Sequence, residues 1–400
     1  MNILEITMFY YPAGGGASTT IESMVKALCK RGHQVHLVYP IFDVSLTSLK
    51  NEKSSQIPNL KLHPIYVKSK FTFKYFKIYD FFTRKLLFQE MFKECNDIIK
   101  SEHIDYIISH FHESTEIGII GQNLSDVYNI PHIVKVHDIY PFISLTPEII
   151  YSILNYSNNK KVMRLSNLIQ FPNKSMREKA VKRYNFNIKK SAILPNGLFM
   201  DDFNESRINL NRKIEQEVNF VFVGGLYRNR RLYNILYSIS EINKEYNFNL
   251  NLYIVGDGVE KPNLIKFISG NKLTRFVKIL GNLSHNEVLE ILNKSHIGIG
   301  PMEKNSISEF QMPIKIIEYM AMGLPWIAYG HDGIIELNDS KCGIIIRSSS
   351  INVIKSEILS LINDRPKYEL MSKCCREYAI EHFDWNKNIE RFLDSIEKKI

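Results

Sequence analysis

A lysine and a glutamate, Lys315 and Glu318, stand three positions apart in a segment that opens at Pro313. Proline followed by this apolar spacing predicts a helix over 313–322. Residues three apart share one face of a helix, so both side chains could reach one ligand. A carboxylate suits adjacent hydroxyls such as those of a ribose, and a lysine at a helix start suits a phosphate. The pair therefore indicates a nucleotide site or, as is common for this spacing, a surface salt bridge.

Two glycine-rich segments stand between a predicted strand and a predicted helix. The first is Gly14 to Gly16, and the second is VGGLYRNRR at 223–231. Glycines at such a turn let backbone amides approach a phosphate, and a following helix adds the positive end of its dipole. The guanidinium groups of Arg228 and Arg230 could also bind a phosphate in bidentate fashion. Simple tight turns are the structural alternative for both segments.

Short apolar runs alternate with amphipathic stretches in both halves of the chain. Strands are predicted at 2–8, 35–38, 106–109, 132–136, 168–171, 191–194, 219–223, 250–255, 277–280, 297–299, 326–329 and 343–346. Helices are predicted at 19–31, 116–128 and 232–244. This alternation predicts parallel sheets with right-handed crossovers. We expect an α/β protein of two Rossmann-like domains facing each other across a cleft, with ligands at the carboxyl ends of the strands.

A polar, turn-rich stretch beginning at Pro195 separates the two halves and predicts a linker. We expect one Rossmann-like domain over 1–203 and a second over 204–382. The remaining residues, 383–400, are expected to form a helix that packs back toward the first domain.

Composition narrows the class of protein. A net charge of +9 favours an anionic partner, although the abundance of Lys, Asn and Ile also points to compositional bias. Five cysteines without a CxxC pair argue against a disulfide framework or a zinc site. The start has no basic leader, and no stretch approaches the roughly 18 apolar residues of a membrane-spanning helix. We expect a cytoplasmic protein, either soluble or peripheral on the inner face of the plasma membrane.

An aromatic and basic segment from Tyr66 to Phe92 interleaves phenylalanines with lysines such as Lys70, Lys74 and Lys77. Such a segment can lie on an anionic membrane. The alternative is a partly buried helix with a solvated basic face. No DNA- or RNA-binding module is recognisable, so no nucleic-acid partner is expected.

Nine segments together resemble the retaining family 4 glycosyltransferases of the GT-B fold, in that family's order along nearly the whole chain. They are MNILEIT with its glycine loop, RGHQVHLV, IPHIVKVHD, LPNGLFMDDF, FVGGLYRNRR, LYIVGDG, VKILGNLSHNEVLEIL, PIKIIEYMAMGLPWIA and FDWNKNIERF. The resemblance implies transfer of a hexose-type sugar from a nucleoside-diphosphate sugar to a glycan or lipid-linked acceptor, with retention of configuration. It also implies that the first domain holds the acceptor, that no cofactor is permanently bound, and that no metal is required. Bacterial envelope polysaccharide biosynthesis is the setting it suggests.

The resemblance also assigns donor-site roles. Glu318 matches the glutamate that holds the donor ribose. Arg230 and Lys315 match the diphosphate-binding residues, and the backbone of Gly15 and Gly16 would pass close to the same diphosphate.

Further positions are matched in the same way. His137 matches a histidine near the donor sugar, and Leu280 to Asn282 match the strand end beside the nucleobase. The remaining donor-loop positions are Gly225, Arg228 and Gly256. His110 and His112 alternate at a strand end and are either acceptor-side residues or structural ones.

Two positions depart from the family pattern. Phe310 stands where the first glutamate of the E-x7-E motif belongs, so that carboxylate is displaced or absent, and whether Glu309 or Gln311 replaces it stays open. Gly225 stands where many members carry arginine, which leaves more of the phosphate charge to Arg228 and Arg230. Two other functions stay open: a sugar-nucleotide epimerase of the same fold, and a non-catalytic partner subunit.

Overall fold

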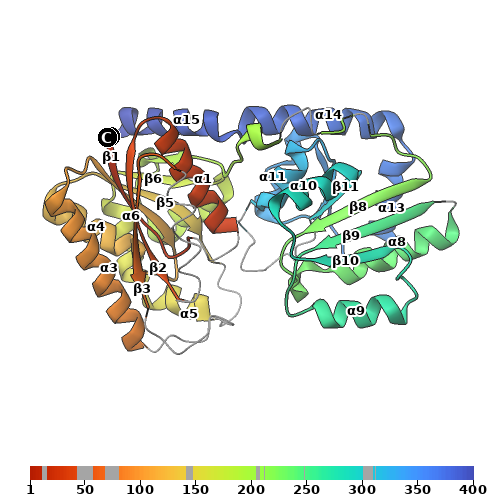
Figure 1. The fold of residues 1–400 in the computed structure, drawn as a ribbon, viewed down its shortest axis with the longest axis horizontal. Coiled ribbons are helices and arrows are strands. Elements are labelled where there is room, and N and C mark those ends of the chain that lie inside the picture. The colour runs from red at the N-terminus through yellow and green to blue at the C-terminus, as the bar shows by residue number, and fades with distance from the viewer. Residues whose placement is uncertain are drawn as a thin grey trace. The chain divides into compact units, whose positions relative to one another are not determined.

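The chain folds into two compact units in the computed structural model (Figure 1). The residues that the structure describes are 1–10, 16–42, 57–67, 81–140, 147–203, 208–210, 212–246, 248–300, 310 and 312–400. The first unit comprises Met1–Gly197 and Trp385–Ile400, and the second comprises Leu198–Asp384.

The first unit is built on a parallel sheet of seven strands in the order β3-β2-β1-β4-β5-β6-β7. Its strands are β1 (Asn2–Ile6), β2 (Gln34–Ile41), β3 (Leu60–Tyr66), β4 (Tyr106–His112), β5 (His132–Asp138), β6 (Leu168–Phe171) and β7 (Ser191–Ile193). The strand order reverses between β1 and β4, so this is the switch point where such sheets bind ligands. All seven residues of β5 are buried, as expected of a central parallel strand.

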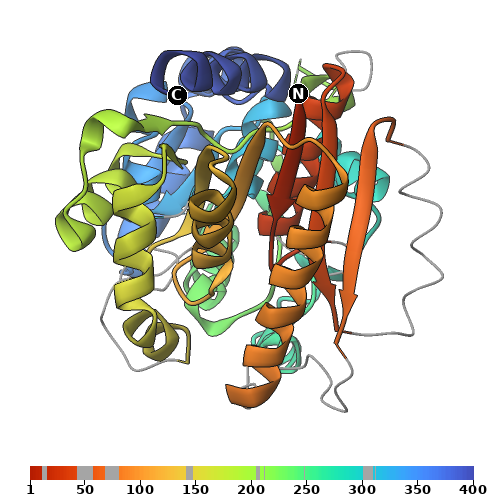
Figure 2. The same cartoon turned by 90° about the vertical axis from the view of Figure 1, so that its left-hand side faces the viewer.

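Helices cover both faces of this sheet. They are α1 (Gly16–Lys30), α3 (Phe81–Ser101), α4 (Ile117–Tyr128), α5 (Pro147–Leu154), α6 (Tyr156–Leu165), α7 (Lys174–Tyr184), the 3₁₀ turn η2 (Ile188–Lys190) and α15 (Trp385–Lys399). The long helix α3 runs along one face of the sheet (Figure 2), where Met91 and Cys95 are fully buried in the core. The terminal helix α15 packs on α1, and an ion pair of 2.7 Å joins Arg31 to Glu390.

The second unit has a six-stranded parallel sheet in the order β10-β9-β8-β11-β12-β13. Its strands are β8 (Glu217–Val223), β9 (Asn249–Val255), β10 (Val277–Gly281), β11 (Ile297–Gly300), β12 (Trp326–Tyr329) and β13 (Gly343–Ile346). Here the order reverses between β8 and β11, which places the switch point of this sheet at the end of β8.

The helical elements of the second unit are η3 (Met200–Phe203), η5 (Arg228–Arg230), α8 (Leu232–Glu245), α9 (Lys261–Gly270), α10 (His285–Lys294), α11 (Ile314–Ala321), α12 (Asp332–Ile335), η6 (Asn338–Ser340), α13 (Ile351–Ile362) and α14 (Arg365–His382). Leu198, Met200 and Phe203 are buried in one apolar cluster with α11. Helix α10 begins with a capping box, in which Ser284 and Glu287 satisfy each other's backbone amides.

The predicted α/β architecture of two Rossmann-like sheets is confirmed. Strand β3 was missed because it is half-exposed at a sheet edge and its pattern is broken by Lys61, His63 and Pro64. Strands β4 and β5 also run further than their apolar residues predict, to His112 and Asp138. The extra residues are polar, and they lie where ligands of parallel sheets bind.

Candidate functional site

Loops after β8, β9 and β10 are joined by backbone hydrogen bonds at one edge of the second sheet. The Gly224 amide donates to the Val255 carbonyl at 2.8 Å, and the Gly256 amide donates to the Gly281 carbonyl at 2.7 Å. Gly256 has a φ of +134°, and a Cβ at this position would lie 2.2 Å from the Gly224 carbonyl oxygen. Only glycine fits here, so Gly256 is required by the packing of the loops.

Helix α11 is fastened to the same edge by Tyr319. The buried phenol accepts a hydrogen bond from the Val223 amide at 3.0 Å and donates one to the Ile299 carbonyl at 3.1 Å. Val223 ends β8 and Ile299 lies on β11, so the phenol bridges the two strands at the switch point. The N-terminus of α11 is thereby held beside the Gly224 loop.

The opposite end of α11 is capped by two buried arginines. Arg212 donates to the Met322 carbonyl at 2.9 Å, and Arg376 donates to the Ala321 carbonyl at 2.6 Å. Cationic groups are favourable at a helix C-terminus, where the free carbonyls carry the negative end of the dipole. These contacts fix the orientation of α11 from the end away from the glycine loop.

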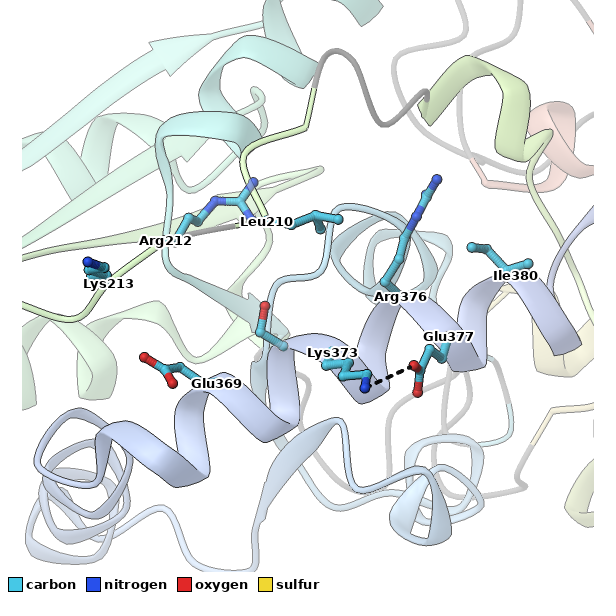
Figure 3. A pocket seen from close by; sticks show the side chains of 9 residues that line it. Leu210, Arg212, Lys213, Glu369, Lys373, Arg376, Glu377 and Ile380 are labelled. Carbon is cyan, nitrogen blue, oxygen red and sulfur yellow. Dashed lines mark ion pairs between the residues drawn. The ribbon is translucent and has the colours of Figure 1, made fainter.

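Both arginines also line a cavity of about 810 Å³ between the chain before β8 and helix α14 (Figure 3). The other lining residues are Leu210, Lys213, Glu369, Ser372, Lys373, Glu377 and Ile380. Lys373 pairs with Glu377 at 3.8 Å. The guanidinium groups of Arg212 and Arg376 donate to carbonyls at the C-terminus of α11. Their positive charges therefore stabilise that helix end rather than the glycine loops.

Lys315 reaches from the first turn of α11 to the glycine loop. Its Nζ lies 4.0 Å from the centroid of the Phe222 ring and would lie 2.7 Å from a Cβ on Gly224. Burial, together with the charge of Arg230, holds the pKa of Lys315 well below its usual value. Burial raises the pKa of Glu318, while Lys315 opposes that rise. The two groups are close enough for each charge to shift the pKa of the other, but no ion pair between them is found among the described residues.

Arg230 lies in the turn η5, immediately before α8. Its guanidinium carbon is 5.8 Å from the centroid of the Tyr227 ring, and burial lowers its pKa. Its Nε is buried without a hydrogen-bond partner among the described residues. Arg228, by contrast, is exposed. Arg230 and Lys315 are therefore two neighbouring cations that an anionic ligand could bridge.

Other donor-loop residues lie around this edge. A Cβ on Gly225 would lie 2.5 Å from the Tyr227 ring, so the small residue leaves room for that ring. Leu280 is half-buried near the end of β10, and Asn282 is exposed just after the strand. The structure brings these residues and Gly256 to the carboxyl edge of one sheet, and their ligand contacts remain predictions.

Three of the positions named from the sequence, Gly15, Glu309 and Gln311, lie outside the described residues. Gly16 is the first residue of α1. Phe310 is buried, with 6% of its surface exposed. Whether Glu309 or Gln311 replaces the motif's first carboxylate therefore stays an open question.

A second polar cluster lies at the switch point of the first sheet. Glu5 Oε2 is 2.7 Å from His110 Nε2, and His110 Nδ1 is 3.0 Å from His137 Nε2. His112 Nδ1 is 2.5 Å from the Asp138 carboxylate, and the His112 ring stacks on His137 with centroids 4.9 Å apart. The predicted histidines thus meet in one group. Glu5 was not predicted as a site residue, although a glutamate inside the apolar run NILEI is a signal that the sequence does contain.

Burial controls the protonation of this cluster. Glu5 and His110 have no exposed surface, and only 9% of His137 is exposed. Burial, reinforced by His112, His110 and Lys135, holds the pKa of His137 well below its usual value. His137 is therefore a neutral imidazole near pH 7 and acts as a hydrogen-bonding group rather than as a cation.

Lys135 is a fully buried lysine on β5, and its Nζ donates to the Leu194 carbonyl at 2.5 Å. Burial lowers its pKa from 10.5 to about 7. One pKa unit corresponds to about 1.4 kcal/mol, so charging this amine in the fold costs on the order of 5 kcal/mol. The cost is complete below pH 7, where both folded and unfolded chains are protonated, and it vanishes as pH rises toward 10.5.

We predict that Lys135→Met raises the melting temperature most at pH 6 and much less at pH 9.5. The physical reason is that methionine fills the volume without a charge, so it removes a cost that wild type escapes only at high pH. Thermal unfolding of both chains across this range measures the difference. A gain in stability that is the same at every pH would contradict the assigned cause.

No group of three or more His, Cys, Asp or Glu side chains in the described ranges could hold a metal ion. None of the helices in the described part of the chain has both the length and the apolar character that a membrane span requires.

Comparison with known proteins extends these findings to both units. Residues 14–201 match the model of Glycosyltransferase Family 4, and residues 217–364 match that of Glycosyl transferases group 1. With two Rossmann-like units and both matched, the chain is a glycosyltransferase of the GT-B fold. It belongs to the family 4, group 1 glycosyltransferases.

Two curated relatives align along nearly their whole length. An uncharacterized glycosyltransferase of Methanocaldococcus jannaschii is 24% identical over 97% of this chain and 96% of its own. The alpha-monoglucosyldiacylglycerol synthase of Acholeplasma laidlawii is 21% identical over the same shares. The structure of an Anabaena protein in complex with UDP-glucose has a TM-score of 0.69 at 16% identity, covering 99% of this chain and 100% of that one.

Proposed function

We propose that this glycosyltransferase moves a hexose-type sugar from a nucleoside-diphosphate sugar to a glycan or lipid-linked acceptor, with retention of anomeric configuration. The observation that carries the proposal is the meeting of Lys315 and Arg230 beside the Gly224 loop. The charge of Arg230 lowers the pKa of Lys315, so the two cations repel unless an anion lies between them. A diphosphate supplies that anion, and UDP-glucose binds a protein of similar fold.

The same groups would act on the reaction. As the sugar leaves, negative charge grows on the diphosphate oxygen, and prearranged cations and loop amides lower the energy of that state. Arg230, Lys315 and the helix N-terminus of α11 would supply this stabilisation without a metal ion. Glu318 would accept hydrogen bonds from the ribose hydroxyls, and His137 would orient the transferred sugar.

An apolar groove on the first unit supports a lipid-linked acceptor. Its volume is about 570 Å³, and α3, α4 and α5 line it with Phe88, Phe92, Ile119, Ile120, Tyr151 and Leu154. Leu154, which lines the groove, is 68% exposed, so the groove presents apolar surface to its surroundings. The Acholeplasma relative is named as the synthase of a glucosylated lipid, alpha-monoglucosyldiacylglycerol. Peripheral binding at the inner face of the plasma membrane, in envelope polysaccharide assembly, is the setting we propose.

The membrane part of the proposal predicts a charge effect. Residues 68–80, at the centre of the predicted membrane-binding segment, lie outside the described residues. Changing Lys70, Lys74 and Lys77 to Glu is expected to abolish most co-flotation with vesicles containing phosphatidylglycerol, because each basic residue contributes about 1 kcal/mol at such a surface.

The matched control changes three exposed lysines of the second unit to Glu, namely Lys266, Lys278 and Lys373. It alters the net charge by the same amount, and its flotation is expected to stay near that of wild type. Unchanged flotation of the first variant, or equal loss in both, would contradict a specific membrane contact.

The donor part is tested with a panel of nucleoside-diphosphate sugars. The correct donor is expected to raise the melting temperature, since a ligand that binds only the folded state stabilises it. Transfer from that donor to glycan and lipid-linked acceptors, with the anomer assigned by NMR, then tests retention. Conversion of the donor without an acceptor would indicate an epimerase instead, and the absence of binding, hydrolysis and transfer would indicate a non-catalytic subunit.

A further inference from the structure

Glu5, His110 and His137 form a continuous chain of hydrogen bonds that crosses three neighbouring strands, β1, β4 and β5. The other oxygen of the Glu5 carboxylate, Oε1, is buried without a partner in the described part of the chain. Within the described residues the Glu5 carboxylate is therefore hydrogen-bonded through Oε2 to His110, and the three groups form one hydrogen-bonded unit.

Counting protons defines two states of this unit. Each of the two contacts needs one proton between its heavy atoms. With Glu5 ionised and both rings neutral, His110 donates from Nε2 to the carboxylate, and His137 donates from Nε2 to His110 Nδ1. His137 Nδ1 then carries a lone pair and is an acceptor, and no described residue bonds it.

Adding one proton reverses that role. The proton enters at His137 Nδ1, the Nε2 proton of His137 passes to His110 Nδ1, and the Nε2 proton of His110 passes to or is shared with Glu5. The incoming positive charge is thus cancelled at the far end of the chain. His137 stays neutral, as its burial demands, but its Nδ1 has become a donor.

We propose that Glu5 and His110 are positioning residues that hold His137 with Nδ1 unprotonated, as the acceptor of a hydrogen bond from a sugar hydroxyl. The identity of that hydroxyl rests on the proposed function, whereas the tautomer is a property of the protein alone. A ring nitrogen fixed as an acceptor selects a hydroxyl and rejects a carbonyl or phosphate oxygen, which has no proton to donate.

The surroundings of the unit favour the same tautomer. His112 from β4 stacks on His137 and is bonded to Asp138, while Lys135 faces the cluster from β5. Both basic groups disfavour an additional positive charge on His137. Tyr10 and, from α1, Cys29 also face Glu5, whose charge helps to raise the pKa values of both groups.

The test is a pH titration of the intact protein labelled with ¹⁵N-histidine, in which imidazole ¹⁵N shifts separate bare from protonated nitrogens. His137→Gln assigns the signals of His137 by their loss. In wild type we expect a bare Nδ1 and a protonated Nε2 at pH 8, with Nδ1 taking up a proton in one step as pH falls. In Glu5→Gln the added proton has no counter-charge, so this step should move down by at least about one pH unit.

Two further variants separate this role from a merely structural one. Glu5→Asp keeps the carboxylate and is expected to keep the step near its wild-type pH. Glu94→Gln removes a carboxylate that pairs with a different histidine: Glu94 Oε1 lies 3.0 Å from His63 Nδ1. This variant should leave the His137 signals unchanged. A protonated Nδ1 at pH 8 in wild type, an unmoved step in Glu5→Gln, or an equal shift in Glu94→Gln would overturn the proposal. None of these readouts requires a sugar donor, so failure of the proposed function would be seen separately.

Discussion

Replacing Arg230 with alanine is expected to lower kcat/KM for sugar transfer by about 100- to 1,000-fold, the range found when one prearranged charge-stabilising group is removed. Its Nε is buried without a partner among the described residues, and its charge acts directly on Lys315. A guanidinium held in this way gains its partner only when an anion binds. Lys315→Ala is expected to cause a loss of the same order, and the double variant less than the product of the two losses, because both cations act on one diphosphate.

Arg228→Ala is the matched control. It removes the same charge from a side chain that lies two positions before Arg230 and is exposed. We expect a loss of less than about tenfold, in keeping with the weak effect of a solvated charge. Steady-state transfer rates with the donor identified by the panel measure these four variants and Glu318→Ala. Full activity of both Arg230→Ala and Glu318→Ala would show that the donor site has been assigned wrongly.

The sequence alone could indicate which residues meet at the edge of the second sheet, because their patterns are local, while their role as a donor site stays a prediction. The glycine turn at Gly224, the cations of η5 and the start of α11 each leave a recognisable pattern over a few residues. The sequence did not reveal contacts between residues that lie far apart along the chain. Arg212 and Arg376 are 164 positions apart, and only the fold reveals that both cap the end of α11.

The first sheet's cluster was harder to predict for the same reason. Glu5 and His110 are 105 positions apart, and they meet because the order of the sheet places β1 beside β4. No periodicity encodes that order. An apolar run marks only the apolar part of a buried strand. The predicted strands therefore ended before the polar residues His112 and Asp138. Polar residues that interrupt or extend a buried strand, such as Glu5 and Lys135, were the signals that the sequence did contain.

The glycine loops themselves give the second prediction of large effect. Gly256→Ala is expected to destabilise the second unit by several kcal/mol and to weaken sugar-nucleotide binding at least tenfold. At a φ of +134° an alanine is strained, and its Cβ would lie 2.2 Å from the Gly224 carbonyl oxygen, where no flexible side chain can move aside. The strand ends must therefore separate, which displaces the loop that carries Gly224 and Gly225.

Gly270→Ala is the control, because that glycine ends α9 with nothing within 4 Å of an added Cβ. Alanine has the higher helix propensity, so this variant is expected to be neutral or up to about 1 kcal/mol more stable. Chemical unfolding measures both stabilities, and thermal shift with the donor measures binding. If Gly256→Ala keeps wild-type stability and affinity, the loops are not held together by the close approach of Gly256 to Gly224. The positions of Lys315 and Arg230 would then depend on α11 and η5 alone, and the glycine loop would have no part in arranging the diphosphate site.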